Sequence, residues 1–153
     1  MRVFRNLALW ARRHLRLKTE RDSVPVVPTA LDPSPIVEDK QLSHDERALL
    51  VWLIEHGTSD ATGYAAQVEQ ARVIGRCRCG CPTIDLGIAG AKERTVGAST
   101  ILADFLGETP GGFHVGVLLH ARNGKLSELE VHSLDRDGIF SLPTIESLKP
   151  LEG

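Results

Sequence analysis

The sequence contains no long hydrophobic run, and this absence sets the first limits on what the chain is. No window of the 153 residues approaches the roughly 18 apolar residues of a membrane-spanning helix. The apolar stretch 7–11 is shorter than the core of an export signal, which needs about seven residues, and it runs into Arg12 and Arg13. The sequence therefore predicts a cytoplasmic protein without a transmembrane segment.

Several motifs of catalysis and cofactor binding are also missing. The glycines match neither a dinucleotide-binding pattern nor a phosphate-binding loop with its lysine. Ser99 and Thr100 lack the Gly-x-Ser-x-Gly pattern that surrounds the nucleophile of many hydrolases. Three cysteines, an odd number, in a chain without an export signal are typical of a reducing compartment. The sequence thus predicts neither an enzyme nor a cofactor.

Charge is nearly balanced in total but unevenly distributed. The chain has 18 Lys or Arg and 20 Asp or Glu residues, a net charge of −2. Residues 1–21 alone carry a net charge of +6, and the remaining 132 residues carry −8. This asymmetry excludes a generally basic nucleic-acid-binding protein and predicts a basic extension attached to an acidic domain.

Three regions follow from periodicity and proline content. Residues 1–21 are predicted to form a basic amphipathic helical extension. One interpretation is that it contacts an anionic membrane or a partner's groove. The other is that it packs on its own domain or remains a mobile extension. Residues 22–42 contain four prolines and are predicted to be a linker. Residues 43–153 are predicted to form a single α+β domain.

Within that domain the pattern changes from helical to extended. Residues 43–46 have the form of a capping box that begins a helix ending at His56, before Gly57. A shorter helix is expected over 61–70. β-Branched residues and glycines predict the strands that follow, at 71–79, 82–88, 99–106, 114–121 and 125–133. We expect N-terminal helices packed on a mostly antiparallel, twisted sheet of four to six strands.

The clearest predicted element is the hairpin of strands 114–121 and 125–133. A two-residue Asn123-Gly124 loop would set valines opposite charged residues, whereas a three-residue loop, 122–124, sets Val115 opposite Val131. The three-residue loop is preferred because it pairs apolar with apolar residues. On the other face it sets His114 opposite His132.

The polar face of this hairpin permits three interpretations. It is a solvated sheet face, as alternation requires, or a metal or catalytic site built on His114, His132 and Glu130, or part of an acidic surface that binds a partner. The third interpretation is preferred because more carboxylates follow in the next turn. The predicted partner-binding residues are Glu128, Glu130, His132, Asp135 and Asp137.

The run Cys77-Arg78-Cys79-Gly80-Cys81-Pro82 is the second unusual feature. On a strand, a one-residue spacing places successive sulfurs about 6–7 Å apart, too far to share a zinc ion. Cys77 and Cys79 are therefore interpreted as small buried core residues. The alternative is a zinc-binding protein that uses Cys77, Cys79 and Cys81, which requires Gly80 to bend the chain sharply.

The cysteine run, with segments 116–120, 124–126 and 128–131, resembles small bacterial proteins with a Cys-Gly-Cys-Pro core. Some proteins of this type are immunity proteins of contact-dependent growth inhibition systems. The resemblance covers about residues 43–150 and implies no catalytic residue. It implies instead a protein that neutralises a cognate toxin domain, such as a nuclease, by stoichiometric occlusion. An acidic surface suits this role because nuclease clefts are basic, and no direct contact with nucleic acid is expected.

Overall fold

The computed structural model describes residues 34–151. The basic helix predicted at 1–21, and the predicted linker as far as residue 33, lie outside the described residues. None of the helices in the described part of the chain has the length and apolar character needed to cross a membrane.

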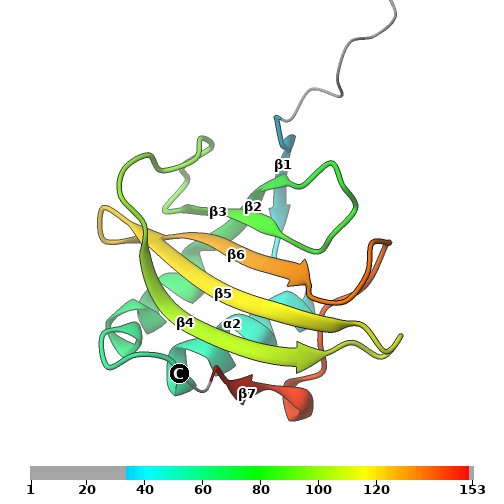
Figure 1. Cartoon of the computed structure of the whole chain (residues 1–153). Coiled ribbons are helices and arrows are strands. Elements are labelled where there is room, and N and C mark those ends of the chain that lie inside the picture. Colours follow the sequence, from blue (N-terminus) through cyan, green and yellow to red (C-terminus); the bar gives the residue numbers. More distant parts are fainter. Residues whose placement is uncertain (1–33, 152–153) are drawn as a thin grey trace, which may run out of the picture. The chain divides into compact units, whose positions relative to one another are not determined.

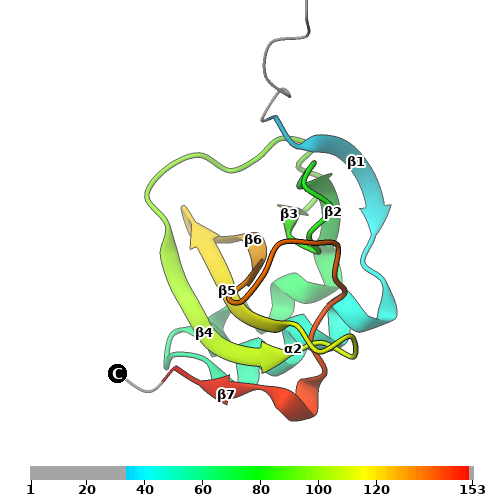
Figure 2. The same ribbon diagram turned by 45° about the vertical axis from the view of Figure 1, so that its right-hand side comes forward.

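The domain is a seven-stranded sheet whose neighbouring strands are all antiparallel. Helix α2 and the 3-10 helix η1 lie against one face of it (Figure 1). The order across the sheet is β1-β2-β3-β6-β5-β4-β7, and Figure 2 shows how strongly the sheet twists along that order. The elements are β1 (Ile36–Gln41), α2 (His44–His56), η1 (Ala61–Gln70), β2 (Ala71–Arg76), β3 (Ile84–Ile88), β4 (Thr100–Glu108), β5 (His114–Arg122), β6 (Lys125–Ser133), η2 (Ile145–Ser147) and β7 (Lys149–Pro150).

The α+β class is thus confirmed, but two parts of the prediction are wrong. The sheet has seven strands instead of four to six, and strand β1 precedes the helices, so they are not simply N-terminal. Strand β1 lies inside 22–42, the range predicted as linker, and the described fold begins before residue 43. Five of its six residues are exposed, so the strand lacks the apolar alternation that would have identified it.

Helix α2 begins and ends as its sequence predicts. The backbone N–H of Ser43 donates to Glu46 Oε2 at 2.8 Å, and the Glu46 N–H donates to Ser43 Oγ at 3.2 Å. The capping box therefore satisfies amide donors that the first helical turn leaves free. Leu49, Leu50 and Leu53 are buried on the side of the helix that faces the sheet.

Over residues 114–121 and 128–133 the β5–β6 hairpin has the predicted faces, but it has another register. Asn123 (φ 50°) and Gly124 (φ 71°) form a two-residue turn, because both can adopt left-handed backbone angles. Ser127 is then an extra residue: Ala121 pairs with Leu126, whereas His120 pairs with Glu128. This bulge shifts the pairing by one residue and so returns the apolar side chains to the core face.

The core lies between the helices and one face of the sheet. Its largest fully buried side chains come from α2 and from strands β2 to β6. They are Leu49, Leu50, Leu53, Val73, Ile84, Leu86, Leu102, Val115, Val117, Leu119, Leu126 and Leu129. The opposite face of the sheet carries the polar alternate residues of β3, β5 and β6, and this face holds the candidate site.

Candidate functional site

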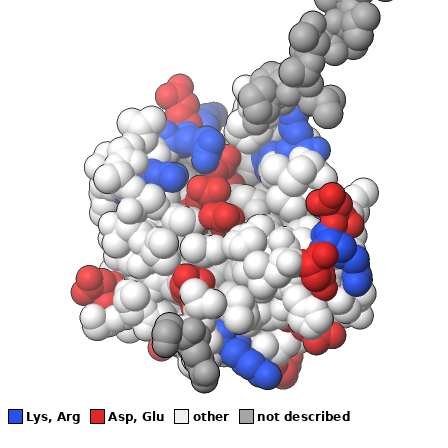
Figure 3. Space-filling model, viewed as in Figure 1, with Lys and Arg blue, Asp and Glu red and all other residues white. Residues whose placement is uncertain are grey.

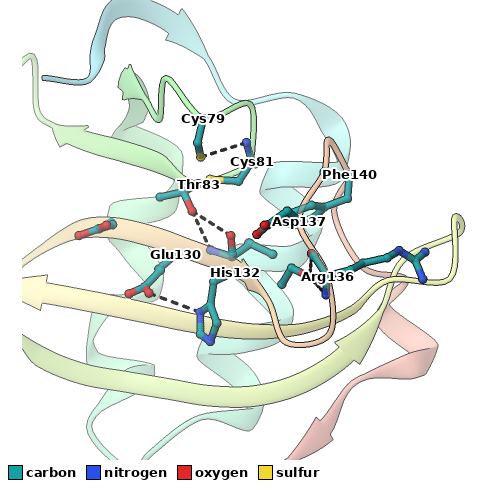
Figure 4. A pocket seen from close by; sticks show the side chains of 12 residues that line it. Cys79, Cys81, Thr83, Glu130, His132, Arg136, Asp137 and Phe140 are labelled. Atoms are coloured by element: carbon teal, nitrogen blue, oxygen red, sulfur yellow. Dashed lines mark hydrogen bonds and ion pairs between the residues drawn. The ribbon is translucent and has the colours of Figure 1, made fainter. Parts of the chain in front are cut away.

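A groove of about 500 Å³ lies on the open face of the sheet. Its walls are the loop 77–83, which joins β2 to β3, and the segment 133–140, which follows β6; the side chains of β6 form its floor. Figure 3 shows acidic side chains gathered in the hollow centre of this face, with basic side chains around them. The polar and sulfur-bearing residues that line the groove include Cys79, Cys81, Glu128, Glu130, His132 and Asp137 (Figure 4).

The groove contains four of the five predicted partner-binding residues, Glu128, Glu130, His132 and Asp137. Asp135 is not among the residues that line it. Its Oδ2 instead lies 2.9 Å from His114 Nδ1, and this hydrogen bond is the main reason that the pKa of Asp135 lies below its usual range. The turn after β6 therefore directs two nearby carboxylates to different places.

The predicted pairing of His114 with His132 is wrong. Because of the bulge in β6, Gly116 lies opposite His132, and a Cβ at residue 116 would meet the imidazole 2.5 Å from Nε2. His132 Nδ1 lies 3.4 Å from Glu130 Oε1, while His114 contacts Asp135. The catalytic or metal site expected from His114, His132 and Glu130 is thus not assembled as a set of three.

A hydrogen-bonded chain that the sequence did not indicate runs through His120. Its Nδ1 lies 2.8 Å from Ser99 Oγ, and its Nε2 lies 2.9 Å from Glu130 Oε2. Serine, histidine and a carboxylate also form the catalytic triad of many hydrolases, where the serine contacts Nε2 instead. Here the two hydrogen bonds of His120 connect the segment before β4 to strand β6. No local sequence pattern indicates this contact, because Ser99 is 21 residues from His120 in sequence.

Beside the groove, two carboxylates face each other across β3 and β6. Asp85 pairs in register with Glu128, and Arg94 lies 2.8 Å from Asp85 Oδ1 and 3.6 Å from Glu128 Oε2. Burial raises the pKa of Asp85 most, Arg94 opposes that rise, and the negative charge of Glu128 adds to it. Arg122 also lies 3.6 Å from Glu128, so this carboxylate faces two guanidinium groups.

The cysteine run forms a loop instead of continuing a strand. Strand β2 ends at Arg76, and Gly80, with φ +86°, turns the chain back. Cys79 is exposed, and Cys77 and Cys81 are half-buried, so the interpretation of Cys77 and Cys79 as buried core residues is wrong. The three Sγ atoms lie within 4.8 Å of one another.

No protein-family model, curated protein or solved structure matches this chain.

Proposed function

We propose that this chain is an immunity protein that binds a cognate toxin domain and neutralises it by occlusion, in the cytoplasm and without catalysis. The observation that supports the proposal most is the gathering of Glu128, Glu130, His132 and Asp137 in one groove. These residues come from the strand β6 and from the segment after it, so a partner that enters the groove meets all four.

The charge of the domain favours a basic partner. Residues 34–153 contain 11 Lys or Arg and 17 Asp or Glu residues, a net charge of −6. Within the groove, Glu130 is hydrogen-bonded to His120, and the ion pairs of the described residues include no lysine or arginine partner for Glu130 or Asp137. Both carboxylates are therefore available to a lysine or arginine of the toxin.

Arg136 also lines the groove, but its contacts direct its charge elsewhere. Its guanidinium lies 3.9 Å from the centre of the Phe113 ring, and its Nη2 donates to Gly111 O at 3.3 Å. Among the described residues, no ion pair joins this guanidinium, which is held against an aromatic ring, to a carboxylate of the groove floor.

Apolar side chains next to the groove complete the pattern of an interface. Ile139 is 83% exposed and Leu134 is 51% exposed, while Phe140 lines the groove itself. A few apolar anchors beside desolvated charges supply most of the binding energy in many protein interfaces. We therefore place the centre of the toxin contact between the loop 77–83 and the segment 133–140.

The test uses the product of the reading frame immediately upstream, because an immunity protein is expected to follow its toxin. The two proteins should form a one-to-one complex by calorimetry, and the association rate should fall steeply with added salt because charge steers the encounter. The double variant Glu130→Gln/Asp137→Asn should bind at least about 30-fold more weakly, since each substitution removes an interfacial charge.

A matched control is Glu55→Gln/Glu146→Gln, which removes two exposed charges outside the groove and should leave the affinity unchanged. Equal weakening by both double variants would show that net charge alone matters and would overturn the assignment of the groove. Absence of any complex, together with no protection of cells that express the upstream protein, would overturn the immunity function.

A further inference from the structure

The loop 77–83 folds back on itself and brings its three cysteines together. Cys77 N–H donates to Thr83 O at 3.4 Å, and Gly80 N–H donates to Cys77 O at 3.5 Å. The second contact closes a turn around Arg78 and Cys79, and Gly80, with its positive φ, comes directly after that turn and directs the chain back. A strand would have kept the sulfurs apart, so this turn is the reason that they converge.

The sulfur positions are close to those of a shared metal ion. All three Sγ atoms lie within 4.8 Å of one another, and Cys77 Sγ lies 2.7 Å from Cys79 Sγ. A tetrahedral zinc ion with Zn–S bonds of about 2.3 Å holds its sulfurs about 3.8 Å apart. The sulfurs therefore need movements of about 1 Å, which an exposed loop permits, to surround one ion.

Backbone N–H groups point at the same sulfurs. Cys79 N–H donates to Cys77 Sγ at 3.4 Å, and Cys81 N–H donates to Cys79 Sγ at 3.4 Å. Hydrogen bonds of this kind stabilise the charged thiolate, which is the form that binds metals.

Packing does not account for the cysteines. Cys79 is exposed, and all three thiols are free, whereas cysteines that serve only as small apolar residues are usually buried. Soft thiolate ligands select zinc, copper(I) or iron–sulfur clusters among the biological metals. Three thiolates with a fourth position open to water fit zinc, which accepts sulfur and oxygen ligands together in a tetrahedral site.

We propose that Cys77, Cys79 and Cys81 bind one Zn²⁺ ion through three thiolates, with the fourth coordination position facing the groove. Cys79 and Cys81 line that groove together with His132 and Asp137 (Figure 4), so a water molecule or a group of a bound partner can complete the tetrahedron. Binding releases the remaining thiol protons to solvent. The site is independent of the proposed immunity function and stands or falls on its own test.

The experiment adds Zn²⁺ to the purified full chain, freed of metal with a chelator and kept reduced with a phosphine. Calorimetry should show one Zn²⁺ per chain, and replacement by Co²⁺ should give the sulfur-to-cobalt charge-transfer absorption of thiolate ligands. Cys79→Ser, at an exposed position, should weaken zinc binding at least about 100-fold, while Arg78→Gln in the same loop should retain the one-to-one stoichiometry.

A second measurement needs no variant. Zn²⁺ should slow the alkylation of all three thiols in the wild-type chain. Alkylation rates that Zn²⁺ leaves unchanged, stoichiometric zinc retained by Cys79→Ser with undiminished affinity, or binding of Cu⁺ but not of Zn²⁺ would each overturn the zinc site. A Cys77–Cys79 disulfide that persists in the phosphine, seen as the loss of two hydrogens in the mass spectrum, would also overturn it.

Discussion

Asp85 and Glu128 hold two negative charges opposite each other across β3 and β6, and Arg94 contacts both carboxylates. Asp85 is only 5% exposed, so water screens the repulsion poorly on that side of the pair. This relationship determines how the open face of the sheet responds to pH.

We expect the Asp85 carboxyl to titrate above its usual range, because burial raises its pKa more than Arg94 lowers it. The folded protein then retains this proton at pH values where the unfolded chain has lost it, so Asp85 lowers stability as the pH rises through its shifted pKa. Relative to Asp85→Asn, the wild type should lose stability as the pH rises above about 4.

Carboxyl NMR titration checks the direction of the Asp85 pKa shift. Asp39 serves as an internal comparison, since Arg72 lowers the pKa of Asp39. Titration of Asp85 below Asp39 would contradict the prediction.

Removing the guanidinium between the two carboxylates should destabilise the fold. Arg94→Gln leaves Asp85 and Glu128 facing each other without this cation, and should cost about 1–3 kcal/mol at neutral pH. The loss should shrink at lower pH, where Asp85 is protonated. Thermal unfolding of the variant across pH measures this, and Lys92→Gln in the same loop serves as the control. An equal loss at all pH values would exclude electrostatic repulsion as the cause.

The glycine after helix α2 is predicted to be sensitive to substitution because of steric contacts. A Cβ at Gly57 would overlap the carbonyl oxygen of Leu102 and lie 2.7 Å from that of Leu53. Gly57→Ala should therefore cost about 1–3 kcal/mol, measured by denaturant unfolding. Gly63→Ala, with nothing within 4 Å of the new methyl group, should be neutral or slightly stabilising. If both variants unfolded alike, steric overlap would not be the cause.

Glu46 has two roles, so its substitution should lower the free energy of unfolding more than the removal of one capping hydrogen bond does. Ser43→Ala removes one capping hydrogen bond and should cost about 1 kcal/mol. Glu46→Ala removes the reciprocal cap and also the contact with Arg76 Nη2 at 2.8 Å, so we expect a larger loss. Chemical denaturation of the two variants gives the order, with exposed Asp45→Ala as the control. A smaller loss for Glu46→Ala would show that Arg76 contributes little.

The hydrogen bond between Ser99 and His120 should protect the segment before β4. Ser99→Ala removes one partner of a 2.8 Å contact and should raise amide hydrogen exchange around residues 95–100 while leaving the core of β5 protected. Ser141→Ala, a substitution of another exposed serine, is the matched control. Unchanged exchange in Ser99→Ala would mean that other contacts hold this segment.

Local signals in the sequence predict much of this fold. The capping box at Ser43 and Glu46 is short-range chemistry, and it fixes the start of α2 correctly. The faces of the β5–β6 hairpin over residues 114–121 and 128–133 follow from alternation and are also correct. The register was wrong because the extra residue Ser127 leaves no mark in the hydrophobic pattern. Its hydroxyl donates to His120 O at 3.1 Å, a contact that only the folded chain reveals.

The candidate site was predictable as a set of residue types but not as a geometry. Glu128, Glu130 and His132 were anticipated because alternation directs them away from the core, and Asp137 because it follows in the next turn. Their proximity to Cys79 and Cys81 depends on the pairing of β3 with β6, which joins segments more than 40 residues apart. Such a contact has no local signature, and neither has the diversion of Asp135 to His114.

Strand β1 has features that oppose edge-to-edge association with another sheet. It is an outer strand whose free backbone groups could recruit another chain, a hazard of any open sheet. The register shift between Val37 and Lys40 interrupts its ladder, and Glu38, Asp39 and Lys40 place charges along it. At the opposite border β7 has only two residues. Irregularity, charge and brevity thus protect both borders of the sheet against polymerisation.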